Sequence, residues 1–239
     1  SMALPPDLRD AVARPGGGQI VLVIGAGCSL DPPTRLPLSR DLSREAHRRL
    51  LEDGILNSAC ANPEDLSSVA DAVWNGVEPH SQRALIDRLP VDEFRNAKPN
   101  EGYLLVSAML REKAISCVIS LNFDLAISHA LSHVGARDDV AVITGPEDHR
   151  NLRAENVIYL HRCAYASPDD WILRSDVLAN AWRGKWEEVI VRRFVAGPTT
   201  VFVGLGSPAA VLLESTAAIR SAIPEGEEPP AAAREHQVR

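Results

Sequence analysis

The residues from Gln19 to Ile24 read Q-I-V-L-V-I, and the chain continues directly into Gly25-Ala26-Gly27-Cys28-Ser29. A continuous β-branched run that stops at glycine is typical of a parallel strand buried on both faces. Glycines at such a strand end let the backbone approach a phosphate, and the free N–H groups can donate to it. Small glycine turns after strands are also common for structural reasons, so this loop alone leaves both interpretations open.

Strands and helices alternate along the rest of the chain. Further strands are expected at 114–121, 140–144, 157–160 and 200–203, and helices at about 39–50, 62–74, 101–111, 124–134, 182–196 and after Ser207. This alternation predicts an α/β fold, a Rossmann-like and mostly parallel sheet with helices on both faces. Because no strand is expected within about 39–111, that stretch is predicted to be an α-helical insert.

The chain is expected to have three parts. Residues 1–18 form an N-terminal segment, 19–223 form the α/β domain with its insert, and 224–239 form a linker or disordered tail. The last part is rich in Pro, Glu and Ala, a composition that buries little apolar surface. Because an interdomain linker has a similar composition, we expect the chain to be one domain of a longer protein.

Composition narrows the class of protein. Of 239 residues, 25 are Lys or Arg and 32 are Asp or Glu, a net charge of −7 that disfavours direct nucleic-acid binding. The arginines at 44, 48 and 49 and at 192 and 193 are interpreted as solvated helix faces. Apolar runs are too short to span a bilayer and no secretory signal is evident, so we expect a cytoplasmic protein without membrane contact. The four cysteines form no C-x-x-C pair, so no zinc site is expected.

The glycine loop departs from two common phosphate-binding patterns. The dehydrogenase fingerprint needs a third glycine and an acidic residue about 20 positions further on, but here a proline-rich loop and a helix follow. A P-loop needs Gly-Lys followed by Ser or Thr, which is absent. The loop therefore belongs to another nucleotide-binding class.

Four separated motifs resemble those of the sirtuin (Sir2) family. They are Gly25-Ala26-Gly27-Cys28-Ser29, Leu121-Asn122-Phe123-Asp124, Tyr159-Leu160-His161 and Val203-Gly204-Leu205-Gly206-Ser207. Each follows or ends an expected strand, and their order matches the family's G-A-G-x-S, N-x-D, L-H and G-x-S motifs over about residues 20–215. Leu36-Pro37 resembles the Ile-Pro of the family's cofactor loop.

The departures from deacylating sirtuins point to one branch of the family. The zinc module with two C-x-x-C pairs is missing, Arg162 replaces the usual glycine, and the spacing from Asn122 to His161 is wider. These features, and the segment Trp171–Asp176, resemble the divergent bacterial Sir2-like domains of phage-defence proteins, which hydrolyse NAD and are usually fused to sensor domains. That branch often has an aspartate after its late G-x-S, and none follows Ser207 within Pro208-Ala209-Ala210.

The resemblance implies roles for particular residues. Asn122 would bind the ribose and order the attacking water, Asp124 would orient the nicotinamide carboxamide, and His161 would contact the ribose hydroxyls and act as general base. NAD would be the substrate, without zinc. The residues expected to bind the cofactor are Gly25, Ala26, Gly27, Ser29, Leu36, Pro37, Gly204 and Ser207.

Alternatives remain for residues and for the function. Asp124 could cap the following helix, Asn122 could stabilise a turn, and a lone histidine such as His161 is usually structural. The leading hypothesis is NAD hydrolysis by an antiviral effector, with a homo-oligomer and a fused or associated sensor domain as its expected partners. A non-catalytic module that binds NAD or ADP-ribose is the second, and protein deacylation is the least favoured.

Overall fold

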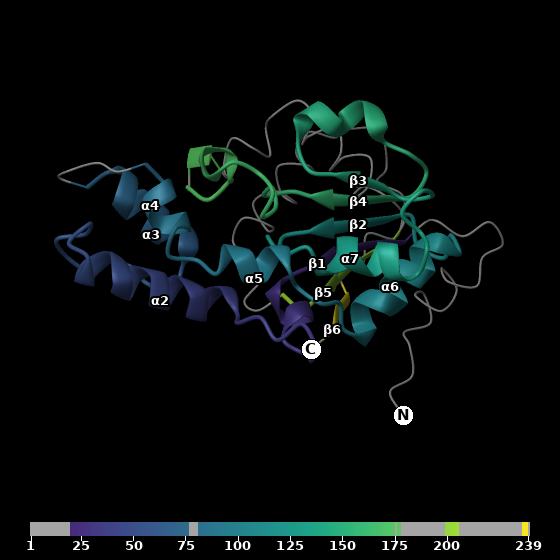
Figure 1. Cartoon of the computed structure of the whole chain (residues 1–239), viewed down its shortest axis with the longest axis horizontal. Helices are drawn as coiled ribbons and strands as arrows, with labels where there is room; N and C mark the ends of the chain where they lie inside the picture. Colours follow the sequence, from purple (N-terminus) through teal and green to yellow (C-terminus); the bar gives the residue numbers. More distant parts are fainter. Residues whose placement is uncertain (1–19, 77–80, 175, 178–198, 206–235, 239) are drawn as a thin grey trace, which may run out of the picture.

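A parallel sheet forms the centre of the protein in a computed structural model that describes residues 20–76, 81–174, 176–177, 199–205 and 236–238. The strands are β1 (Ile20–Ile24), β2 (Cys117–Ser120), β3 (Ala141–Ile143), β4 (Asn156–Tyr159), β5 (Thr199–Val203) and β6 (His236–Val238). Their order is β3-β4-β2-β1-β5-β6, and every neighbouring pair is parallel. The α/β, Rossmann-like class predicted from the sequence is confirmed (Figure 1).

The end of the chain differs from the expected linker or disordered tail. Residues 236–238 pair in parallel with β5 and form the edge strand β6. Backbone hydrogen bonding to an open sheet edge needs no particular side chains, so a strand of three residues reading H-Q-V leaves little signal in the sequence. The rest of 224–239, the N-terminal segment 1–18, and the expected helices at 182–196 and after Ser207 lie outside the described residues.

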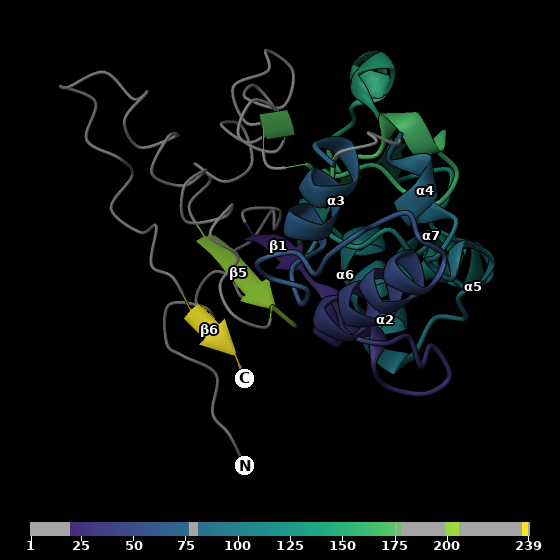
Figure 2. The same cartoon turned by 90° about the vertical axis from the view of Figure 1, so that its left-hand side faces the viewer.

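Alternate side chains of β1 enter two separate apolar clusters, because successive residues of a strand point to opposite faces. Ile20, Leu22 and Ile24 belong to the cluster that includes residues of the helices, whereas Val21 and Val23 join Cys117 and Ile119 on the other face. Every residue of β1 is buried, as the β-branched run predicted. Figure 2 shows the labelled helices grouped on one side of β1 and β5.

The segment between β1 and β2 contains the helices α2 (Ser39–Glu52), α3 (Leu66–Trp74), α4 (Arg83–Ile86), α5 (Val91–Arg95) and α6 (Glu101–Arg111). The helix α7 (Ala126–His133) follows β2. Asp65 caps α3 by accepting the Ser67 N–H, and Asn100 caps α6 by accepting the Tyr103 N–H. In Figure 1 α2, α3 and α4 extend past the strand ends marked by the arrowheads, which are the carboxyl ends. No helix in the described part of the chain is long and apolar enough to cross a bilayer.

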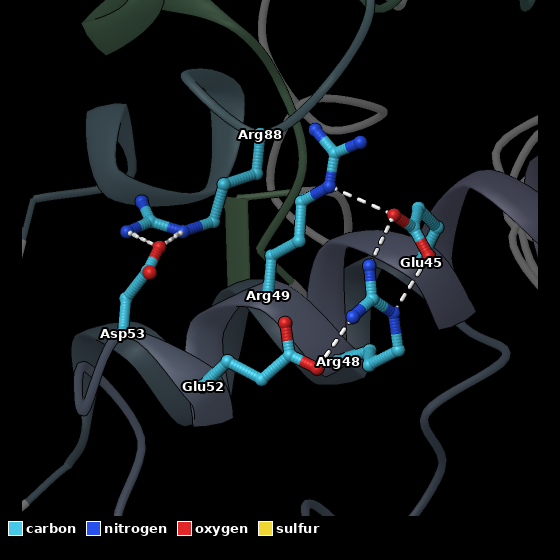
Figure 3. Close-up of polar contacts among 6 residues, drawn as sticks. All are labelled: Glu45, Arg48, Arg49, Glu52, Asp53 and Arg88. Atoms are coloured by element: carbon cyan, nitrogen blue, oxygen red, sulfur yellow. Dashed lines mark hydrogen bonds and ion pairs between the residues drawn. The ribbon is translucent and has the colours of Figure 1, made fainter.

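The outer face of α2 carries ion pairs between residues three or four positions apart. Glu45 accepts hydrogen bonds from Arg48 and Arg49, and Arg48 also pairs with Glu52 (Figure 3). All four side chains are solvated, so each pair contributes little stability. The expectation of a solvated face rather than a basic patch is confirmed for these arginines. Arg88 and Asp53 pair at 2.6 Å and join the loop after α4 to the end of α2.

The connections place a topological switch point between β1 and β5. From β1 the next strand, β2, lies toward one edge of the sheet, whereas from β5 the next strand, β6, lies toward the opposite edge. Open parallel sheets bind ligands beside the carboxyl ends of their strands at such a switch point. The glycine loop after β1 and Gly204 after β5 lie at this point.

Candidate functional site

The glycine loop packs directly against the loop after β5. The N–H of Gly25 donates to Val203 O at 3.0 Å, and that of Gly27 donates to Gly204 O at 2.8 Å. A Cβ on Gly27 would lie 2.8 Å from Gly204 Cα, and one on Gly204 would lie 2.5 Å from the Cys28 nitrogen. Gly204 also has φ +65°, a backbone conformation that favours glycine. Close loop packing therefore explains these glycines, and their role toward a phosphate stays a prediction.

A small hollow of about 30 Å³ lies between the strand ends and the helical insert. Six residues predicted from the sequence to form the site line it: Ala26, Ser29, Leu36, Pro37, Asn122 and Asp124. Leu121 and Phe123 contribute from the loop after β2. The insert adds mainly apolar side chains, those of Leu42, Leu66, Leu89 and Phe94. Four polar residues lie in this otherwise apolar lining: Ser29, Ser39, Asn122 and Asp124. A few polar groups among apolar side chains are a common feature of small-molecule sites.

Four buried side chains form one hydrogen-bond network at the bottom of this hollow. Ser29 Oγ donates to Asp124 Oδ2 at 2.8 Å and lies 2.6 Å from Tyr103 Oη. Asn122 Nδ2 donates to Gly25 O at 3.0 Å and to Tyr103 Oη at 3.2 Å, with Ser29 Oγ at 3.4 Å. The network joins the glycine loop, the loop after β2 and helix α6. It fixes the two predicted site residues of the N-x-D motif relative to Ser29.

The amide oxygen of Asn122 takes no part in this network. Its nitrogen contacts the three acceptors of the network, and Oδ1 has no hydrogen-bond partner among the described residues. Oδ1 is also not a fully buried unpaired atom, and Asn122 lines the hollow. The oxygen is therefore an acceptor accessible to a bound molecule.

The Asp124 carboxylate has a structural partner as well as Ser29. Its Oδ1 accepts the N–H of Ala126, the first residue of α7, at 3.0 Å, although the N-cap position that the sequence offered for Asp124 belongs to Leu125. Burial raises the pKa of Asp124, and the hydrogen bonds from Ala126 and Ser29 partly offset that rise. Burial likewise raises the pKa of the neighbouring Cys28 thiol to about 11, which makes it a poor nucleophile.

His161 lies in the loop after β4, level with Asn122. Ser120 of β2 pairs with Tyr159 of β4, and the two site residues each follow two positions later. His161 is half-buried, and it is not among the described residues that line the hollow. Burial lowers the pKa of His161 from 6.5 to about 4, and a hydrogen bond with the backbone of Ile172 opposes that change. The ring is therefore neutral at pH 7 but only weakly basic.

The two site loops are joined by Phe123. Its carbonyl accepts the N–H of Ala164 at 2.8 Å, and its ring stacks on Trp171 with centroids 4.4 Å apart. Phe123 itself lines the hollow. The segment after His161 is thus held beside the site through this aromatic contact.

Sequence reasoning found most of the site but missed Tyr103 and Asn100. Asn100 Nδ2 donates to Cys28 O at 2.8 Å and so fastens the glycine loop to the start of α6. In the sequence both residues have only the features of an ordinary capped helix. Gly204 packs on Gly27 as described above, and Ser207 lies outside the described residues. Within the described ranges, no three His, Cys, Asp or Glu side chains gather where a metal ion could bind.

Comparison with known proteins adds no identification. A scan against models of protein families finds none that matches the chain, and a search of curated proteins finds no match. The resemblance to sirtuins therefore depends on the four motifs and their order alone.

Proposed function

We propose that the protein binds NAD at the carboxyl ends of β1, β2 and β5 and hydrolyses the bond between nicotinamide and ribose. The observation that carries the proposal is the buried Asn122, which lines the hollow and whose nitrogen is held by Gly25 and Tyr103 while its oxygen has no partner among the described residues. A fixed acceptor at a switch point of a parallel sheet suits a ribose hydroxyl or an attacking water. The order of the four sirtuin-like motifs supports NAD as the ligand.

The reaction needs little acid catalysis. Water adds to the anomeric carbon of NAD⁺ as the bond to nicotinamide breaks, giving ADP-ribose, neutral nicotinamide and one proton. Positive charge develops on the ribose, as in glycoside hydrolysis. Asn122 Oδ1 would accept a hydrogen bond from the water or a ribose hydroxyl. The apolar side chains of Leu42, Leu89 and Phe94 would surround the nicotinamide ring, with Ser29 and Asp124 near its carboxamide.

A specific observation favours a second candidate, a module that binds NAD or ADP-ribose without hydrolysing it. His161, the proposed general base, does not line the hollow among the described residues, and its pKa of about 4 is well below the optimum for a base acting at pH 7. Binding needs the hollow and the loops, whereas hydrolysis also needs His161 to reach the ribose. An antiviral role, a fused or associated sensor domain and a homo-oligomer belong to the leading proposal and rest on the sequence resemblance.

Release of nicotinamide from NAD by the full chain tests the proposal. We expect turnover that Asn122→Ala lowers at least about a hundredfold, since a positioned acceptor contributes several kcal/mol to a transition state. Asn96→Ala is the matched control, because Asn96 is exposed and donates only to Asp92 O in its own helical turn. Measurements over a range of protein concentrations include any oligomer. Tight binding of NAD by calorimetry without turnover would establish the second candidate, and neither binding nor turnover would exclude both.

A further inference from the structure

Counting protons gives the hydrogen-bond network at the bottom of the hollow a direction. The single hydroxyl proton of Ser29 is donated to Asp124 Oδ2, and the other carboxylate oxygen accepts the Ala126 N–H. Ser29 therefore has no second proton for Tyr103, which lies 2.6 Å away. With the Asp124 carboxyl group ionised, Tyr103 is the donor in that contact.

The same argument fixes the orientation of the Asn122 amide. With its own proton given to Ser29, Tyr103 Oη can only accept from Asn122 Nδ2 at 3.2 Å. The second acceptor of Nδ2 is Gly25 O at 3.0 Å, which has no proton to give. A flipped amide would place Asn122 Oδ1 against two oxygens that cannot donate to it. The order of donors and acceptors in the network thus keeps the amide oxygen outside it, as an acceptor without a partner among the described residues.

We propose that Tyr103 is a positioning residue for the site, which holds the Asn122 amide so that its oxygen faces the bound ribose or water. The catalytic consequence of this inference rests on the proposed function, whereas the orientation of the Asn122 amide depends only on hydrogen-bond geometry. Tyr103 is almost fully buried, and its hydroxyl contacts only groups of the site network among the described residues. It acts through Asn122 and not on the substrate.

Tyr103→Phe removes the hydroxyl alone and leaves the ring in the core. We expect kcat for nicotinamide release to fall about tenfold, equivalent to about 1.4 kcal/mol, with KM within about twofold. The matched control is Tyr159→Phe, because Tyr159 is also fully buried, does not line the hollow, and within the described part of the chain its hydroxyl bonds only to Ser128, at 2.8 Å. Tyr103→Phe loses two buried hydrogen bonds and Tyr159→Phe loses one, so both melting temperatures should fall, that of Tyr103→Phe further, whereas only Tyr103→Phe lowers kcat. Equal kcat in the two variants, or a change confined to KM, overturns the proposal.

A spectroscopic measurement separates this inference from the proposed function. The side-chain amide resonances of Asn122, assigned by their loss in Asn122→Ala, report its hydrogen bonds without any substrate. In Tyr103→Phe we expect one of the two protons to move upfield and to exchange faster with water, while Tyr159→Phe leaves both unchanged. If the parent does not hydrolyse NAD, the proposed function fails and this spectrum alone decides the role of Tyr103. Unchanged Asn122 resonances in Tyr103→Phe overturn that role whatever the kinetics.

Discussion

At the scale of single residues, His161 links the site to the pH dependence of folding. Burial lowers its pKa from 6.5 to about 4 in the folded protein, so the unfolded chain binds the proton more tightly. The contribution of this residue to stability is therefore present above about pH 6.5 and is lost as pH falls through about 4. A neutral ring at pH 7 is also what a proton acceptor requires.

Replacing His161 with glutamine should remove this pH dependence. Each unit of pKa difference corresponds to about 1.4 kcal/mol, and the residue is only half-buried, so we expect the parent to lose about 2 kcal/mol relative to His161→Gln between pH 7 and pH 4. Urea unfolding of both proteins across this range measures the difference. A constant difference from pH 7 to pH 4 would show that the imidazole is not withdrawn from water.

At the scale of elements, the loops after β1 and β5 pack directly against each other. Gly204→Ala should destabilise the protein by about 3 kcal/mol, because the new Cβ would lie 2.5 Å from the Cys28 nitrogen in addition to requiring φ +65°. Gly54→Ala is the control, since Gly54 has φ +70° with nothing within 4 Å of an added Cβ. It should lose only about 1 kcal/mol from the backbone conformation. Equal losses in chemical denaturation would mean that the two loops do not pack as described.

The elements that local pattern specifies were predicted well from the sequence. The β-branched run gave β1, and the helix expected at 101–111 is α6 (Glu101–Arg111). The expected strand at 114–121 is longer than β2 (Cys117–Ser120), because apolar character continues beyond the hydrogen-bonded residues. Strand order could not be read in this way: β5 lies beside β1 although about 175 residues separate them, and periodicity carries no information on such pairing.

The residues of the site also divide into those that the sequence predicts and those that it does not. Ser29, Asn122 and Asp124 follow strands, and the carboxyl ends of parallel strands meet at one edge, so their convergence was predictable. The place of Tyr103 in the site was not predictable, because its position in its own helix is that of a core residue. The partners of its hydroxyl come from the loops after β1 and β2. The placement of His161 relative to the hollow depends on the course of the loop after β4, which no local pattern determines.

At the scale of the whole molecule, the hollow and the glycine loop must act on one ligand if the proposed function is correct. The hollow joins the helical insert to the strand ends, and the glycine loop joins β1 to β5. A dinucleotide can contact both regions, with its nicotinamide riboside half in the hollow and its pyrophosphate by the glycines. A ligand that lacks the pyrophosphate contacts only the first.

This geometry predicts unequal stabilisation of the folded protein by two ligands. With Asn122→Ala, which prevents turnover, NAD at about 100 times its dissociation constant should raise the free energy of unfolding by about 2.7 kcal/mol. For a domain of this size that corresponds to a rise in melting temperature of about 5–10 °C. Nicotinamide riboside at the same concentration should give a clearly smaller rise, because it leaves the glycine loop without a partner. Equal shifts would confine binding to the hollow, and the absence of any shift with NAD would show that the strand ends and the insert do not form a dinucleotide site.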